Sequence, residues 1–128
     1  MLPAYAELHC LSNYTFLRGA SHPEELVRQA SKLGYQSIAI TDECSLAGVV
    51  RAYGEAKHLG TKLIVGSEFT LQDGLKIILL ASNLNGYGNL CELITLARSR
   101  CDKGAYSISR ADLNQHIDDC LVLWCPAE

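Results

Sequence analysis

Short apolar runs alternate with amphipathic helix patterns along this chain, and this alternation restricts its fold more than any other feature of the sequence. The run at residues 37–41, Ser-Ile-Ala-Ile-Thr, has no polar residue at its centre, which is typical of a strand covered on both faces. Between the runs, apolar residues recur every three or four positions, as in a helix with one buried face. The order strand, helix, strand, helix, strand predicts right-handed parallel βαβ units, and therefore an α/β fold. The expected strands are residues 5–11, 37–41, 62–66 with a continuation through 68–71, 75–80 and 120–125.

Capping signals predict where two of the helices begin. Ser21 and Glu24 have the spacing of a capping box, and Pro23 suits the first turn, where its missing N–H costs nothing. Ser109 is followed three residues later by Asp112 and is the expected cap of a short helix. The expected helices are residues 21–33, 46–59, 87–100 and 109–116.

Glycines and one turn motif predict where other elements end. Gly34 and Gly60 each follow the last apolar position of a helical pattern, which is a common place for a helix to stop. Gln72-Asp73-Gly74 is a tight-turn signal. We therefore expect a hairpin near residues 69–80 within a mostly parallel sheet.

The composition is that of one ordinary domain. At 128 residues and 14.0 kDa, with 48% apolar and 20% charged residues, the chain is long enough to bury a core. Its formal net charge of -3 argues against a free-standing nucleic-acid-binding module, which is normally basic. The longest apolar run, residues 120–125, is far shorter than the roughly 18 residues of a membrane span, and residues 1–7 lack the pattern of a signal peptide. We therefore expect a cytoplasmic protein with no membrane role.

Six cysteines are spread along the sequence, and only Cys120 and Cys125 are near neighbours. In a strand these two side chains would point to opposite faces. We expect reduced, mostly buried thiols. A disulfide framework and a metal or redox role are the alternatives.

Polar side chains follow three of the expected strands, at the ends where functional residues of parallel α/β proteins gather. His9 lies near the end of the first strand, Asp42 and Glu43 follow the second, and Glu68 follows the third. Imidazole and carboxylate ligands can hold Zn, Mn or Mg and activate a water for phosphoester hydrolysis. Alternatively, acidic residues after strands are solvated caps or turn formers. The sequence has no His-x-His or His-Glu-x-x-His pair to fix two metal ligands.

Four segments resemble, in the right order, the motifs of the PHP (polymerase and histidinol phosphatase) domain of C-family bacterial DNA polymerases. Together they cover nearly the whole chain. Within that family, Glu-Leu-His-Cys-Leu-Ser-Asn-Tyr at residues 7–14 and Thr-Asp-Glu-Cys-Ser-Leu-Ala-Gly at residues 41–48 look most like the error-prone, damage-inducible branch. The four segments are residues 5–20, 39–48, 64–69, and 78–81 followed by 86–90.

The chain departs at four positions from the metal-binding members of the family that it resembles. The resemblance implies a second His in the first motif, an Asp before the Gly of that motif, and a His at two later positions. This chain has Leu11, Arg18, Glu43 and Lys76 there. The ligands that remain of the implied set are His9, Asp42 and Glu68.

Two of these departures, Arg18 and Lys76, add positive charge where a dication would bind. At about 4 Å and an effective dielectric near 20, two unit charges repel by about 4 kcal/mol, and a dication doubles this energy. We therefore predict that the two cations replace the metal and neutralise the remaining carboxylates through charge-assisted hydrogen bonds. The result would be a vestigial metal site with a structural role and no catalytic residue, made of His9, Asp42, Glu43 and Glu68.

The resemblance also implies a larger parent protein. PHP domains are distorted (β/α)7 barrels, so residues 1–128 would be the N-terminal part of such a barrel, ending after its fourth or fifth strand, with the polymerase core elsewhere. The parent would be a DNA-directed DNA polymerase, a nucleotidyltransferase that uses Mg in translesion synthesis, DNA repair and DNA replication. The fragment alone would be inactive and bind no cofactor. The implied partners are the rest of the chain, DNA through other domains, the sliding clamp and mutagenesis accessory proteins.

Other interpretations predict different properties. A half-barrel would leave sheet edges unpaired, so the fragment is expected to self-associate. One alternative function is a metal-dependent phosphoesterase or 3′-5′ exonuclease in which Glu43 substitutes for a His ligand. Another is a small ligand-binding α/β domain, which would need a deep closed pocket.

Overall fold

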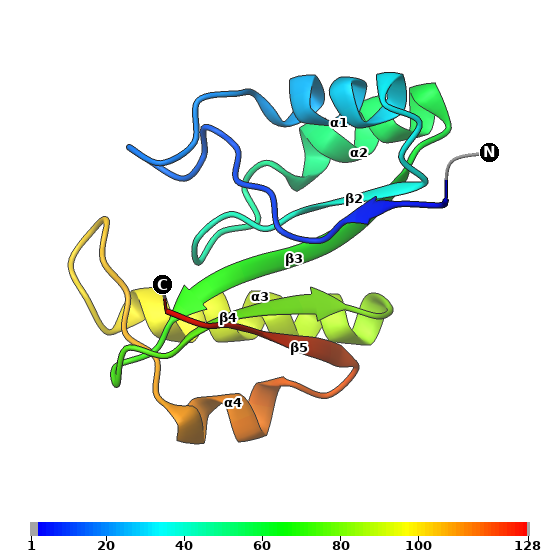
Figure 1. Cartoon of the computed structure of the whole chain (residues 1–128). Coiled ribbons are helices and arrows are strands. Elements are labelled where there is room, and N and C mark those ends of the chain that lie inside the picture. The colour runs from blue at the N-terminus through cyan, green and yellow to red at the C-terminus, as the bar shows by residue number, and fades with distance from the viewer. Residues whose placement is uncertain (1–2, 128) are drawn as a thin grey trace.

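The computed structural model describes residues 3–127, which contain every strand and helix expected from the sequence, in the expected order (Figure 1). This confirms the α/β fold class. The strands are β1 (Ala6–Glu7), β2 (Ser37–Ile40), β3 (Lys62–Thr70), β4 (Lys76–Ala81) and β5 (Cys120–Cys125). The helices are α1 (Pro23–Lys32), α2 (Val49–Leu59), α3 (Leu84–Ser99) and α4 (Arg110–His116).

The strands form one sheet in the order β1-β2-β3-β4-β5. β1, β2 and β3 are parallel, whereas β4 runs antiparallel to both β3 and β5. The expected hairpin is confirmed, since Phe69 of β3 lies opposite Ile77 of β4. Within residues 3–127, β1, β2, β3 and β5 run in the same direction and β4 runs against them, so the expectation of mostly parallel strands with one hairpin is confirmed.

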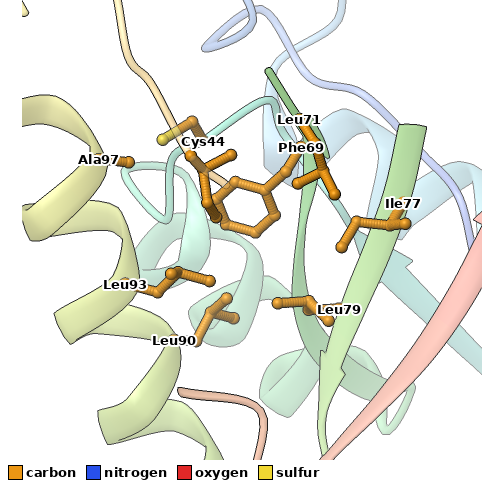
Figure 2. Close-up of a cluster of buried hydrophobic side chains, with 9 residues drawn as sticks. Cys44, Phe69, Leu71, Ile77, Leu79, Leu90, Leu93 and Ala97 are labelled. Atoms are coloured by element: carbon orange, nitrogen blue, oxygen red, sulfur yellow. The ribbon is translucent and has the colours of Figure 1, made fainter. Parts of the chain in front are cut away.

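The sheet curls, and helices cover it in two groups. Figure 1 shows α1 and α2 over the part built from β2 and β3, and α3 and α4 beside the part built from β4 and β5. Each group encloses its own hydrophobic core. Figure 2 shows the larger core, in which Phe69 and Leu79 of the hairpin face Leu90 and Leu93 of α3. Complete burial of one such side chain contributes about 1.5–3 kcal/mol. A third, smaller cluster consists of Ala39, Ile78 and Leu80, with partly buried neighbours on β3 and β5.

The two predicted helix caps have different outcomes. The Ser109–Asp112 capping box is confirmed, with both reciprocal hydrogen bonds present at the start of α4. The Ser21–Glu24 box is wrong, because α1 begins at Pro23 with His22 as its N-cap and no side-chain cap. Ser21 belongs to the preceding loop, where its carbonyl accepts a hydrogen bond from the Asn13 N–H at 2.8 Å.

Three element boundaries also differ from the sequence prediction. β1 ends at Glu7, because the residues after it make isolated hydrogen bonds to the sheet rather than a continuous ladder. In one of these bonds the Thr41 N–H donates to the Cys10 carbonyl at 2.7 Å. α2 starts at Val49, three residues later than expected. α3 starts at Leu84, three residues earlier than expected, because the Asn83 side chain caps it.

All six cysteines are free thiols in the structure. Only Cys44 is fully buried, and the other five are partly exposed, so the prediction of mostly buried thiols is wrong. Burial raises the pKa of Cys44 to about 11. None of the helices within residues 3–127 is long and apolar enough to cross a membrane.

Candidate functional site

The strand-end residues meet at one edge of the sheet, as the sequence predicts. His9 follows β1, Asp42 and Glu43 follow β2, and Glu68 lies near the end of β3. The backbone of this region continues the parallel pairing past β2. The Glu68 N–H donates to the Asp42 carbonyl at 3.0 Å, and the Cys44 N–H donates to the Glu68 carbonyl at 2.8 Å. These bonds place the carboxylate side chains of neighbouring strands next to one another.

Glu68 is the fully buried centre of the site. Its Oε2 lies 2.5 Å from Nη1 of Arg18, and its Oε1 lies 2.9 Å from Nε2 of His9 and 3.3 Å from Nη2 of Arg18. Burial alone would raise the pKa of Glu68. The hydrogen bonds from Arg18 and His9, with the charges of Arg18 and Lys76, outweigh burial and hold this pKa below its ordinary value. Glu68 is therefore a buried carboxylate that its neighbours keep ionised.

Asp42 is also buried, but its partners are neutral. One carboxylate oxygen accepts from the Ser12 N–H and the Thr15 hydroxyl, both at 2.7 Å, and the other accepts from the Ser12 hydroxyl at 2.6 Å. The sequence prediction that Arg18 or Lys76 would neutralise Asp42 is therefore wrong. Ser12 and Thr15 were missed as site residues, although both lie in the first motif and have the short hydroxyl side chains that commonly satisfy a nearby carboxylate.

Arg18 reaches the site from the loop that precedes α1. This loop closes tightly at its base, where a Cβ on Gly19 would lie 1.9 Å from the Ser12 carbonyl oxygen. Only glycine permits that approach. The Arg18 guanidinium also lies 3.4 Å from Oε1 of Glu43, so one cation is shared between two carboxylates.

Lys76 does not join these contacts. It lies at the first position of β4, opposite Thr70 and diagonal to Glu68. Within residues 3–127, no carboxylate lies at ion-pair distance from its ammonium group. Its positive charge does contribute to lowering the pKa of Glu68. The predicted direct pairing of Lys76 with the carboxylates is therefore not formed.

Glu43 links the site to the loop after α3. Its Oε2 accepts from the Tyr106 phenol at 3.3 Å, and its backbone carbonyl accepts from Arg98 at 3.3 Å. The Arg98 guanidinium also lies over the Tyr106 ring, 5.3 Å from its centroid. Sequence reasoning missed Arg98 and Tyr106, because nothing local indicates that these two positions meet residue 43.

The residues at this edge do not fit a divalent cation. Both oxygens of Asp42 and both oxygens of Glu68 already accept hydrogen bonds from side chains of the chain itself. Arg18 brings a full positive charge to the position between Glu43 and Glu68. In the part of the chain that the structure describes, no three His, Cys, Asp or Glu side chains are grouped so that they could hold a metal ion.

Comparison with protein families matches residues 7–126 to the PHP domain. The chain belongs to the PHP-domain family. This PHP domain is 61% identical, over 98% of its length, to an error-prone DNA polymerase from Dechloromonas aromatica. It is 58% identical, over 97% of its length, to an error-prone DNA polymerase from Methylococcus capsulatus. The chain spans 13% and 12% of the lengths of these two relatives.

Two solved structures have a fold similar to that of this chain. A protein from Bifidobacterium adolescentis, described as a metal-dependent phosphoesterase, matches 76% of this chain with 26% identity and a TM-score of 0.61. An amidohydrolase from Chromobacterium violaceum matches 75% with 23% identity and a TM-score of 0.63, which is evidence for the fold alone. The PHP domain described here covers 34% of each of those chains.

Proposed function

We propose that this chain is a structural PHP module of an error-prone DNA polymerase, in which Arg18 takes the place of the metal ion found in other members. The observation that carries the proposal is the fully buried Glu68 carboxylate, held by Arg18 at 2.5 Å and by His9 at 2.9 Å. A cation that belongs to the chain supplies the charge compensation that a dication would supply. His9, Asp42, Glu43 and Glu68 form the vestigial site.

The parent polymerase would carry the chemistry. Its identity is inferred from relatives that are named error-prone DNA polymerase and of which this chain spans about an eighth. In this proposal the parent is a nucleotidyltransferase that uses Mg in a polymerase core outside this segment. It would act in the cytoplasm, in translesion synthesis, DNA repair and replication, with the sliding clamp and mutagenesis accessory proteins as partners. Residues 1–128 would supply the N-terminal part of the PHP domain and no catalytic group.

A second candidate is a metal-dependent phosphoesterase or 3′-5′ exonuclease. The similarity to the Bifidobacterium adolescentis protein favours it. The contacts of Glu68 and Asp42 count against it, because chain donors take the oxygens that a metal would need.

Metal content separates the two candidates. We expect less than stoichiometric Mn, Zn or Mg by elemental analysis after the purified protein is incubated with each metal and desalted. The variant Arg18→Asp, which removes the cation and adds a ligand, should bind more of at least one metal than the wild type does. The control Arg51→Asp reverses an exposed charge that pairs with Glu24 and should leave the metal content unchanged. A stoichiometric, tightly held metal in the wild type would contradict the structural proposal.

A further inference from the structure

The loop of residues 12–19 presents two large apolar side chains at its tip. Phe16 is 85% exposed and Leu17 is 88% exposed. Leu17 also has φ 66°, in the left-handed region that a leucine adopts only at a cost. Packing within residues 3–127 does not account for two exposed apolar side chains on a strained backbone.

The base of this loop is fixed by hydrogen bonds, whereas the side chains of Phe16 and Leu17 at its tip are exposed. Ser12 and Thr15 donate to the buried Asp42 carboxylate, and Arg18 is fixed by Glu68. The Gly19 N–H donates to the Thr15 carbonyl at 3.0 Å, which closes the turn behind the tip. The bonds at the base restrict the backbone of this short loop, which reduces the backbone entropy that would be lost if a partner bound Phe16 and Leu17.

A hollow of about 280 Å³ adjoins the tip, between this loop and the loop after α3. Figure 1 shows the two loops on the same side of the molecule, the first in blue before α1 and the second in yellow to orange after α3. Tyr14, Phe16 and Tyr106 contribute aromatic rings to the lining. The charged groups of the lining, Arg98 and Glu43, are already paired within the chain. The hollow thus fits an apolar or aromatic side chain better than a charged one.

We propose that the loop surface, defined as Tyr14, Phe16, Leu17 and the adjoining hollow, docks against an apolar segment elsewhere in the same polymerase chain. This inference rests on the proposed function. About seven-eighths of each relative lies outside the matched segment. In this proposal that remaining part of the polymerase is the covalently linked partner. β5 runs in the same direction as β3, and Cys125 at its end lies opposite Lys76, which is itself diagonal to Glu68 across the β3–β4 pairing. A parent chain that continues from β5 would therefore emerge at the edge of the sheet where the loop surface lies.

Hydrogen exchange on the full-length polymerase tests the docking. The amides of Phe16 and Leu17 donate to no acceptor within residues 3–127, so in a free loop they would exchange almost without protection. We expect exchange at these amides to be slowed at least about tenfold in the full-length wild type. The protection should be lost in the double variant Phe16→Ser/Leu17→Asn, in which Asn suits the positive φ. It should be retained in the control Val50→Ser, which replaces an 81% exposed apolar residue on α2.

Three results would overturn the docking proposal. The first is unprotected exchange at these amides in the full-length wild type, a measurement that does not depend on any variant folding. The second is protection that persists in the double variant. The third is protection that appears only as protein concentration rises, which would indicate contact between two copies of the chain. Primer extension by the same wild-type preparation tests the proposed function separately, because its absence would count against a polymerase parent whatever the exchange data show.

Discussion

Asp42 and Glu68 are two buried carboxylates at the same edge of the sheet, and the protein compensates them in different ways. Asp42 accepts hydrogen bonds from the backbone and hydroxyl of Ser12 and from the hydroxyl of Thr15. Glu68 is bound by the guanidinium of Arg18 and the imidazole of His9. Neutral donors stabilise a carboxylate by hydrogen bonding alone, whereas Arg18 adds an opposite charge. The two sites should therefore respond differently to mutation, pH and salt.

The largest effect should come from Arg18→Met, which removes the cation and leaves Glu68 buried with only His9. Removal of one partner of a buried ion pair costs about 3–5 kcal/mol, and the partial exposure of Arg18 reduces this to about 2–4 kcal/mol of unfolding free energy. Urea denaturation of the wild type and the variant measures the difference. Arg51→Met, which breaks an exposed pair with Glu24, should cost less than about 1 kcal/mol. Equal losses in the two variants would mean that the buried Arg18–Glu68 pair contributes no more to stability than the exposed Arg51–Glu24 pair.

Thr15→Val should have the next largest effect, because it removes a hydroxyl that donates to Asp42 and accepts from the Glu43 N–H, with little change in side-chain volume. The expected loss is about 1.5–3 kcal/mol, the usual range for a hydrogen bond to a charged group. The same denaturation experiment measures it. Thr70→Val, at the exposed end of β3, is the matched control and should change stability by less than about 0.5 kcal/mol. A cost for Thr15→Val that is no larger than the control's would show that Ser12 satisfies Asp42 without help.

Acid should weaken the Glu68 site. The pKa of Glu68 is lower in the folded protein than its ordinary value of 4.5, so the unfolded state binds the proton more readily. The stability that Glu68 contributes is complete above the unfolded pKa and is lost as pH falls through the lower, folded pKa. Glu68→Gln should therefore reduce the slope of unfolding free energy against pH below about pH 5, by at most about 1.4 kcal/mol per pH unit.

Thr70→Val is the control for that pH series, since it changes an exposed side chain at the end of β3 and leaves the hydrogen bonds of Glu68 in place. Its unfolding free energy should depend on pH with the same slope as that of the wild type. If Glu68→Gln and the wild type have the same slope, the charge of Glu68 does not couple to folding.

Salt should produce the smallest difference between the two sites. Arg18 is partly exposed, so raising the ionic strength from 0.05 M to 1 M should reduce the cost of Arg18→Met by roughly 0.5 kcal/mol. The cost of Thr15→Val should not change, because the lost donor is neutral. Denaturation of both variants at the two salt concentrations gives the comparison. A salt effect of equal size in both variants would mean that the charge of Arg18 does not distinguish the Glu68 site from the Asp42 site.

Much of the fold could be predicted because its signals are local. The periodicity of apolar residues located each strand and helix, and Gln72-Asp73-Gly74 located the hairpin. Helix boundaries were harder to predict where a residue outside the helix makes a hydrogen bond near the expected cap. Ser21 fits a capping box by spacing, but its carbonyl is held by Asn13 and the helix starts one residue later than that box requires.

The sequence predicted which charged residues gather at the candidate site, but only some of the contacts that they make with one another. The strand-end rule brought His9, Asp42, Glu43 and Glu68 together, and the family resemblance singled out Arg18 and Lys76. In the structure, Arg18 pairs with Glu43 and Glu68, whereas Lys76 makes no direct contact with the carboxylates within residues 3–127. Asp42 accepts hydrogen bonds from Ser12 and Thr15 instead. Lys76 lies diagonal to Glu68 across the β3–β4 pairing, and within residues 3–127 its charge lowers the pKa of Glu68 without forming a direct ion pair.

The sequence by itself determined the order of the elements, the hairpin, the family and the edge of the sheet at which the charged residues gather. These follow from short-range periodicity, from motifs and from the rule that parallel strands end at one edge. Only the tertiary structure decided which donor satisfies which buried carboxylate. That choice depends on the path of residues 12–19 over the sheet edge, which is fixed by contacts between residues far apart in sequence, such as Thr15 with Asp42 and Arg18 with Glu68.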